Sequence, residues 1–546
     1  MERYTSDLPD QIENPTRLLK IEKDAVGVRL VQTNQAEKYE YVTLSHRWGL
    51  SKSISTKKSN VHSHMHRGIK TSALPATFRD AVIVTHKLGY QYLWIDSLCI
   101  VQDDTRDWEL ECPRMASIYY GSVLTIAGTA AKDSHFGLLR EREFLGKPAY
   151  ETKLQYRDEY GNAQDSLTLY YPGRPSTRGG FHDAFSKSPE GHDQSSVLQN
   201  LGWMLQDTVP EYPEVPDRNS VLQGRGWIFQ ENLLSRRTLN FAPGQMYMVC
   251  HQGARYETSL FKGAFPHPDS KVNPTYPPMN TIRWETDFGY YRWWRGTVAK
   301  YSSCEFTTIM DRLPALSGIA NRFKPPEPDQ YLAGIWRHDI LRSLLWRRKG
   351  TPHSDAPAEY LGPSWSWASA PARIEFMHVE EGSASISSAS LVSAATVRKG
   401  ADPYGRVASG TITIRGKVSE IAFEKTIPTE GQFSKPQFAI SRPGWYEPPE
   451  FYVDDPGWTP PVPEAADVDD AHDDETYPGS PRFILLLISI VRFIGGTAHL
   501  LALERVSGKE LVYRRVGVVV RNQTRVNVNE FVESFKDWDD REITII

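Results

Sequence analysis

The alternation of apolar and polar positions is clearest between Tyr41 and Gly128, where it predicts strands separated by helices. Tyr41–Gly49 opens as a short apolar strand, and the nearly continuous apolar run Tyr92–Val101 is typical of a strand covered on both faces. Leu74–Leu88 has apolar residues at helical spacing, and Ser122–Gly128 predicts a third buried strand. Strands that alternate with helices form a parallel sheet, and ligands usually bind beyond the carboxyl ends of its strands.

Polar and aromatic side chains gather where these strands are expected to end. Those that follow the first two strands are Ser45, His46, Arg47 and Trp48, and then Asp103, Asp104, Trp108, Glu109 and Glu111. Asp96 interrupts the second strand, and it is either a ligand-facing carboxylate or a structural acid bonded to backbone amides. Arg47 either binds a ligand at this edge or forms an ordinary ion pair with Asp96 or Asp104.

The helical stretch that follows the second strand contains Pro113, which would cost about 3 kcal/mol inside a helix. A helix that starts at Pro113 and turns Met115, Ile118 and Tyr119 inward avoids this cost. Glu111 would then precede a helix N-terminus, where the helix dipole favours its ionised form.

The C-terminal third reads as a β-rich domain, which we place at residues 371–546. Strand-like segments are Gly410–Phe423, Leu511–Val520 and Glu542–Ile546. Phe483–Leu503 is long enough to span a bilayer, but Arg492 and the Gly495-Gly496 pair interrupt it, so two buried strands around a turn explain it better. Glu447–Pro481 holds eleven acidic residues, eight prolines and no Lys or Arg, and it predicts a flexible, disordered surface loop.

The remaining boundaries follow from shifts in pattern. Residues 1–40 are a lead-in to the α/β domain at 41–250, which carries a polar insertion near Tyr171–Ser196. Residues 251–370 are predicted to be mainly helical, because the segments DRLPALSGIANRF and YLAGIWRHDILRSLLWRR both have apolar residues at helical spacing.

Composition excludes several classes of protein. A net charge of −4 is too balanced for a dedicated nucleic-acid binder, and four widely spaced cysteines form neither a disulfide framework nor a zinc module. The start of the chain has no pattern of a signal peptide or anchor, so we expect a cytoplasmic protein. His62, His64 and His66 alternate, but their polar surroundings indicate a loop, and we predict no metal site. Fifteen tryptophans indicate deep cores or partly open aromatic pockets.

Three ordered blocks resemble the fungal heterokaryon-incompatibility (HET) domain. They are YVTLSHRWG; LPATFRDAVIVTHKLGYQYLWIDSLCIVQDD with DWELECPRMASIYYGSVLTIAG; and RGWIFQENLLSRRTLNF, at Arg225–Phe241. The resemblance implies a role in fungal non-self recognition that leads to growth arrest or cell death. HET domains are similar, distantly, to the flavodoxin-like TIR domains of immunity, some of which cleave NAD+ with a single glutamate.

Carried onto this chain, the resemblance makes Glu111 the best candidate for the catalytic acid, with Glu109 as its rival. It implies no cofactor, with NAD+ as a substrate. Cleavage of the nicotinamide glycosidic bond builds positive charge on the ribose and releases a neutral pyridine, so one carboxylate near the ribose suffices. Arg47 could then pair with the diphosphate, and Trp48 or Trp108 could stack on a ring.

Two other functions remain open. One is a TIR-like interaction module that signals by assembling with protein partners or with itself and cleaves nothing. The other is a relative that binds a nucleotide without turnover. In the third block, Trp227 and Leu233 are expected to pack against the α/β domain, while Gln230 and Glu231 either close a pocket or join a hydrogen-bond network between domains.

Overall fold

The computed structural model describes two compact units, each built from several separate segments. The described residues are 13–49, 53–140, 151–157, 163–170, 224–243, 246–250, 253–256, 287–322, 325, 327–350, 359–377, 385–425, 438–441, 449–455, 482–491, 496–522 and 528–546. The first unit takes those within 1–108, 118–223 and 235–281, and the second takes those within 109–117, 224–234 and 282–546. The predicted insertion at Tyr171–Ser196 lies outside the described residues.

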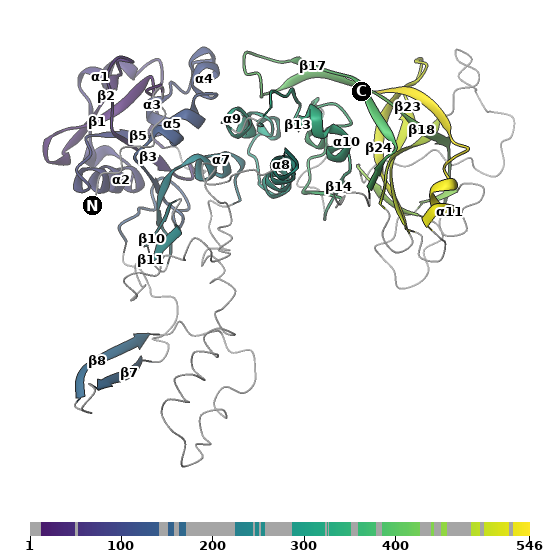
Figure 1. The fold of residues 1–546 in the computed structure, drawn as a ribbon. Helices are drawn as coiled ribbons and strands as arrows, with labels where there is room; N and C mark the ends of the chain where they lie inside the picture. The colour runs from purple at the N-terminus through teal and green to yellow at the C-terminus, as the bar shows by residue number, and fades with distance from the viewer. Residues whose placement is uncertain are drawn as a thin grey trace, which may run out of the picture. The chain divides into compact units, whose positions relative to one another are not determined.

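A mixed sheet with a parallel centre forms the core of the first unit (Figure 1). Its order is β11-β10-β9-β6-β3-β5-β1-β2-β4. The parallel strands are β3 (Tyr41–Ser45), β5 (Tyr92–Trp94), β6 (Leu124–Ala127) and β9 (Arg237–Phe241). All five residues of β3 are buried, because β5 and β6 flank it and helices lie between the strands in sequence. The predicted parallel α/β sheet is therefore present at the expected positions.

Antiparallel strands extend this sheet on both sides. They are β1 (Arg17–Ile21), β2 (Gly27–Gln32) and β4 (Ile69–Lys70) beyond β5, and β10 (Met246–Cys250) and β11 (Gly253–Tyr256) beyond β9. A separate hairpin pairs β7 (Glu151–Arg157) with β8 (Ala163–Tyr170). The first 40 residues are thus more than a lead-in, since two of their segments pair in the sheet.

In the first unit, one predicted helix is confirmed, and one segment predicted as a strand contains a helix. The predicted helix is α2 (Ala76–Lys87), which buries Phe78 and Val82. The predicted strand Tyr92–Val101 is wrong beyond Trp94, because the chain turns into a short helix, α3 (Asp96–Cys99). Leu98 is fully buried in that helix, and a buried apolar run does not by itself distinguish a helix from a strand.

The segment around Pro113 is divided differently from the prediction. Helix α4 (Thr105–Glu111) ends before the proline, and α5 (Met115–Gly121) begins after it with Met115, Ile118 and Tyr119 buried as expected. Glu111 therefore ends α4, where the dipole disfavours a negative charge, and does not directly precede a helix N-terminus.

The histidine-rich segment, expected as a loop, is the short helix α1 (Val61–His66). His64 is buried there, with Nδ1 lying 3.0 Å from Thr56 Oγ1. Among the described residues, no group of three or more His, Cys, Asp or Glu side chains could hold a metal ion.

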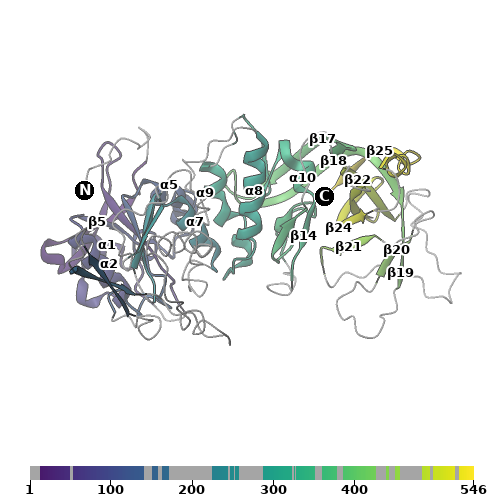
Figure 2. The same cartoon turned by 60° about the horizontal axis from the view of Figure 1, so that its bottom comes forward.

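The first part of the second unit is less helical than the pattern predicted. Its helices are α7 (Gly226–Leu234), α8 (Asp287–Tyr301), α9 (Pro314–Arg322) and α10 (Ile340–Ser343), with α8 and α9 prominent in Figure 2. The expected helix over Tyr331–Arg348 is mostly wrong, because it contains β12 (Tyr331–Leu332), β13 (Ile335–Trp336) and β14 (Trp346–Arg348) as well as α10. Ala333 and Gly334 have φ of 47° and 94° and turn the chain between β12 and β13. Strand β14 pairs with β15 (Ile374–Phe376).

The C-terminal part of this unit is β-rich, as predicted. Its main strands are β16 (Ser385–Ser387), β17 (Ala389–Arg398), β18 (Val407–Glu420), β22 (Phe483–Val491), β23 (Thr497–Arg505), β24 (Val512–Asn522) and β25 (Asp539–Ile545). Because β18 pairs with both β22 and β25, the path β22-β23-β24-β25-β18 closes into a ring. A smaller pair joins β19 (Ala422–Lys425) to β20 (Phe438–Ser441).

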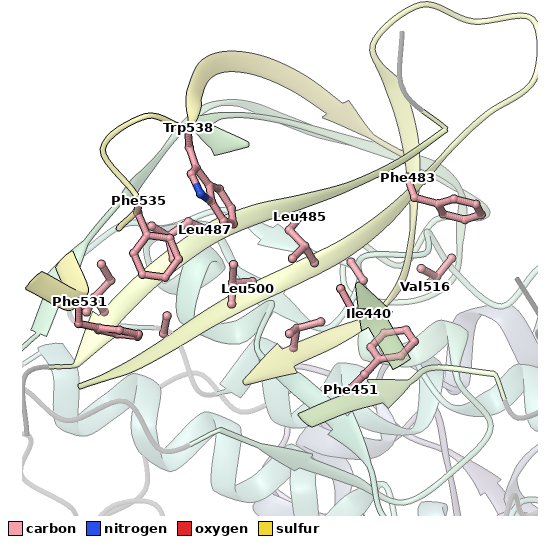
Figure 3. Packing of buried hydrophobic residues seen from close by; sticks show 14 residues of the cluster. Ile440, Phe451, Phe483, Leu485, Leu487, Leu500, Val516, Phe531, Phe535 and Trp538 are labelled. Atoms are coloured by element: carbon pink, nitrogen blue, oxygen red, sulfur yellow. The ribbon is translucent and has the colours of Figure 1, made fainter. Parts of the chain in front are cut away.

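The apolar run Phe483–Leu503 falls in the antiparallel pair β22–β23, as predicted. Both strands are buried almost throughout, and Figure 3 shows Leu485, Leu487 and Leu500 in a core with Phe531, Phe535 and Trp538 from α11 (Val528–Glu533) and the turn after it. In the part of the chain that the structure describes, no helix combines the length and apolar character needed to cross a membrane.

Within the predicted acidic loop, β21 (Glu450–Val453) pairs with β24, and Phe451 enters the core shown in Figure 3. Residues 456–481 of that loop lie outside the described part.

Candidate functional site at the carboxyl edge of the parallel strands

The strand order reverses beside β3, which places a polar edge at the centre of the first unit's sheet. From β3 the chain crosses to β5 on one side and then returns to β6 on the other. Ligands in open α/β sheets bind beyond the carboxyl ends of the strands at such a reversal. Ser45 ends β3, Asp96 follows β5, and Gly128 follows β6 with its N–H donating to the Ser45 carbonyl at 3.0 Å. The sequence placed the first two of these residues at this edge.

Three of the predicted residues, Trp48, Asp96 and His46, lie together here. Trp48 Nε1 donates a hydrogen bond to Asp96 Oδ2 at 2.7 Å. The other oxygen, Oδ1, accepts from the Ser97 backbone N–H at 2.7 Å and lies 4.0 Å from His46 Nδ1. Asp96 is thus bonded to a backbone amide, as a structural acid would be, and its side chain is 19% exposed.

His46 is buried at the carboxyl end of β3. Its side chain is 1% exposed and meets the Phe78 ring edge-on at 4.8 Å between centroids. Burial lowers the pKa of His46 below its ordinary value, and the Asp96 carboxylate opposes that shift. Within the described residues, His46 Nε2 has no hydrogen-bond partner, and the same holds for the buried hydroxyls of Ser45 and Ser97.

The loop after β6, residues 128–140, is fixed to the start of α2 by two side chains that sequence reasoning missed. Asp80 Oδ2 accepts from the backbone N–H groups of Leu138 and Leu139 at 2.7 and 3.0 Å. Thr77 Oγ1 donates to the Asp133 carbonyl and accepts from the Gly137 backbone N–H, both at 3.1 Å. Both side chains are buried in α2, and their only sequence signal is a polar pair beside its apolar face. They hold the loop against the sheet edge.

The other predicted residues of the first unit have more local roles. Asp103 Oδ1 accepts from the Lys58 backbone N–H at 2.7 Å, and Asp104 pairs with the Lys58 ammonium at 3.4 Å. Of the ion pairs expected for Arg47, neither that with Asp96 nor that with Asp104 is present among the described residues. Trp108 is 37% exposed on α4.

The two candidate catalytic acids belong to the second unit. Glu109 is exposed, whereas Glu111 is only 3% exposed and its Oε1 lies 3.5 Å from Arg114 Nη1. Both fall in the segment 109–117, which packs with the middle of the chain.

The third sequence block is divided, since its helix α7 belongs to the second unit and its strand β9 to the first. Trp227 was expected to pack against the α/β domain, but its Nε1 donates to Asp311 Oδ2 at 3.2 Å. The same carboxylate accepts from Arg406 Nη2 at 2.9 Å, so it links α7 to the segment before β18. Gln230 Oε1 accepts from the Gly318 backbone N–H at 3.0 Å, in a hydrogen bond between α7 and α9.

Gly318 lies where α5, α7 and α9 meet, and its replacement by alanine is expected to lower the free energy of unfolding by about 1 to 3 kcal/mol. A Cβ at this position would lie 2.4 Å from Ala116 Cβ and 2.6 Å from Gln230 Oε1. The Gln230 side chain can shift, but Ala116 Cβ cannot rotate away, so relief requires α5 and α9 to move apart. Urea unfolding followed by far-UV circular dichroism measures the loss.

Gly296→Ala is the matched control, because Gly296 is exposed within α8 and a Cβ there would meet no described neighbour within 4 Å. Alanine at that site should be neutral or stabilise by roughly 0.5 to 1 kcal/mol. Equal stability of the two variants would contradict the close approach of the three helices.

Comparison with known proteins identifies the domain in one part of the chain. Residues 41–231 match the family model described as Heterokaryon incompatibility protein (HET), which confirms the resemblance in the sequence. These residues form a heterokaryon-incompatibility domain. The matched range includes the parallel strands β3, β5 and β6, the polar edge, and most of α7. No curated protein and no solved structure matches the chain significantly.

Proposed function

We propose that this protein is a cytoplasmic effector of fungal non-self recognition whose HET domain kills or arrests the cell by hydrolysing NAD+ at the nicotinamide glycosidic bond. The observation that carries the proposal is the polar edge at the strand reversal of a HET-family sheet. The parallel strands run β5-β3-β6-β9, which is second, first, third and fourth in chain order. That order is the one found in flavodoxin-like sheets, and it supports a relation to TIR domains.

Cleavage of the nicotinamide glycosidic bond requires mainly electrostatic stabilisation from the protein. As the glycosidic bond breaks, positive charge develops on the ribose, and one preorganised carboxylate stabilises it. Glu111 is our proposed catalytic acid, with Glu109 as the alternative. Arg47 is half-buried beside Trp48 at the polar edge and is our proposed partner for the diphosphate.

The test is to incubate the purified full-length chain with NAD+ and follow nicotinamide release. Glu111→Gln is expected to lower the rate about 100- to 1000-fold, which is the usual cost of losing one preorganised group in an active site. Glu530→Gln is the matched control, because it neutralises an exposed glutamate on α11. Thermal melts show whether Glu111→Gln keeps the wild-type fold.

Two results would contradict the proposal. If the wild-type chain releases no nicotinamide even when it is concentrated or oligomerised, the proposal that it hydrolyses NAD+ is rejected. If Glu111→Gln and Glu109→Gln both keep full activity, the catalytic acid is another residue.

One observation favours a second candidate function, a non-catalytic module that signals by assembling with itself or with partners. Glu111 is almost fully buried and lies near Arg114, which is the environment of a structural acid. Under this alternative, overexpression arrests growth while cellular NAD+ stays constant.

A further inference from the structure

We propose that Asp96 binds the vicinal hydroxyls of a ribose, and that the ligand reaches Asp96 by displacing the indole N–H of Trp48. This inference rests on the proposed function in one respect, namely that the ligand is a nucleotide. It adds the residue that recognises the sugar and the contact that must break before the sugar binds.

The carboxylate of Asp96 has acceptor capacity that the protein leaves open. An ionised carboxylate has about four lone-pair sites. In the structure, Oδ1 accepts from the Ser97 backbone N–H and Oδ2 accepts from Trp48 Nε1. The bond to the backbone fixes the carboxylate at the start of α3, whereas the bond to Trp48 comes from a side chain that can rotate away. Two adjacent hydroxyls of a ribose can donate to such a carboxylate, as in dinucleotide-binding sheets.

Three buried polar atoms near the carboxyl ends of β3 and β5 match a ligand rich in hydroxyls. Ser45 Oγ, His46 Nε2 and Ser97 Oγ are buried without a hydrogen-bond partner among the described residues. Native proteins pair nearly all such groups, and exceptions often mark functional sites. Hydroxyls and a neutral imidazole can each donate or accept, as sugar hydroxyls also can.

The alternatives to a sugar fit less well. A phosphate beside Asp96 would meet a carboxylate, so its charge would be opposed. A metal ion would need several ligands, and the described residues contain no group of three or more that could hold one. The hydroxyl-bearing part of the nucleotide is therefore the part that this cluster suits.

The Trp48 side chain is open to solvent, whereas its backbone is held by a contact. The residue is 41% exposed, so little packing holds the indole. Its carbonyl accepts from Ser134 Oγ at 3.4 Å, and the next residue, Gly49, has φ of 76° and lies against Asp133. Once displaced, the indole offers a flat apolar face beside the sugar.

Calorimetric titration of the full-length chain with ADP-ribose and with AMP tests the proposal without any cleavage step. Trp48→Phe keeps an aromatic ring but removes the N–H, so it is expected to bind ADP-ribose roughly 3- to 10-fold more tightly, because no hydrogen bond to Asp96 must be broken. Asp96→Asn is expected to bind at least about 10-fold more weakly. 2′,3′-DideoxyAMP, which lacks the vicinal hydroxyls, should bind with the same low affinity to wild type and Asp96→Asn.

Ser97→Ala keeps the test valid if Asp96→Asn is unstable. It removes a hydroxyl that has no described partner, so the melting temperature should stay unchanged while ADP-ribose affinity falls. Failure of wild type to bind either diol-containing probe would overturn the proposal, as would unchanged affinity in both Trp48→Phe and Ser97→Ala. Binding that depends on Asp96 without nicotinamide release would leave this inference standing and reject NAD+ hydrolysis. If wild type releases nicotinamide but Asp96→Asn, Trp48→Phe and Ser97→Ala bind ADP-ribose as wild type does, NAD+ hydrolysis stands and this inference is rejected.

Discussion

Replacing Arg515 with methionine is expected to lower the free energy of unfolding by about 3 to 5 kcal/mol, because removal of one member of a buried ion pair leaves the other charge without its partner. Arg515 lies on β24 with a side chain that is 0% exposed. Its Nη2 lies 3.0 Å from Asp454 Oδ1, and its guanidinium stands 3.6 Å from the centre of the Trp346 ring. The side chain therefore ties the closed ring of strands to the aromatic middle of the second unit.

The loss of hydrogen bonds to two backbone carbonyls also lowers the stability of the Arg515→Met variant. Arg515 Nη1 donates to the Leu344 carbonyl at 3.0 Å, and Nη2 donates to the Trp346 carbonyl at 2.5 Å. Methionine fills similar space but donates nothing. Burial raises the pKa of Asp454 to about 7, and Arg515 opposes that shift, so the variant's Asp454 will take up a proton near neutral pH. Protonation limits the loss but does not restore the hydrogen bonds.

Arg514→Ala is the matched control for this experiment. Arg514 is 54% exposed at its side chain and pairs with Glu504 at 2.6 Å, so its loss should cost only about 0 to 1 kcal/mol. The double variant Arg515→Met with Asp454→Leu should recover part of the stability, since it leaves no unpaired charge. Urea unfolding measures all three variants. A cost below about 1 kcal/mol for Arg515→Met would show that the pair is not buried as described.

Trp294→Ala is expected to have a comparable effect, about 3 to 5 kcal/mol, because it removes a large buried aromatic side chain. Trp294 is 2% exposed on α8, and its Nε1 donates to the Gly334 carbonyl at 3.0 Å. Its ring meets Trp336 edge-on at 5.8 Å and Tyr331 at 6.0 Å between centroids. The cavity would open in the centre of this aromatic cluster, where neighbouring rings are too rigid to fill it.

The adjacent residue provides the control for the same substitution. Trp293 is only half-buried, so Trp293→Ala should cost about 1 kcal/mol. Thermal unfolding of the pair, with near-UV circular dichroism to report the aromatic packing, measures the difference. If the two variants lose the same stability, the cluster around Trp294 does not hold this part of the chain together.

The burial of the tryptophans differs between regions of the chain. Trp294, Trp336, Trp346, Trp365 and Trp367 are among the largest fully buried side chains, and they all lie in the middle segment. Trp94 is buried on β5 of the first unit, whereas Trp48 and Trp108 are exposed. Composition left deep cores and partly open aromatic pockets as alternatives, because the exposure of each residue depends on what packs against it.

In the first unit, the sequence pattern predicted where helices and strands occur more accurately than it predicted the residues at which they end. Three buried strands and α2 were predicted at the right places, because apolar periodicity and turn residues are local properties. The end of β5 was missed because an apolar run fits a strand or a buried helix equally well. The hairpin at Tyr331–Trp336 was missed for a related reason, since its turn depends on Ala333 and Gly334 adopting positive φ against the Trp367 ring.

By itself, the sequence determined the HET domain at residues 41–231, the parallel α/β order, the β-rich C-terminal part and the strand pair at Phe483–Leu503. These follow from local periodicity and from ordered motifs. Only the tertiary structure decided that Trp48 donates to Asp96, that His46 is buried beside them, and that Trp227 and Gln230 bond within the second unit. Such contacts join residues tens of positions apart, and spacing along a chain carries no information about which distant surfaces meet.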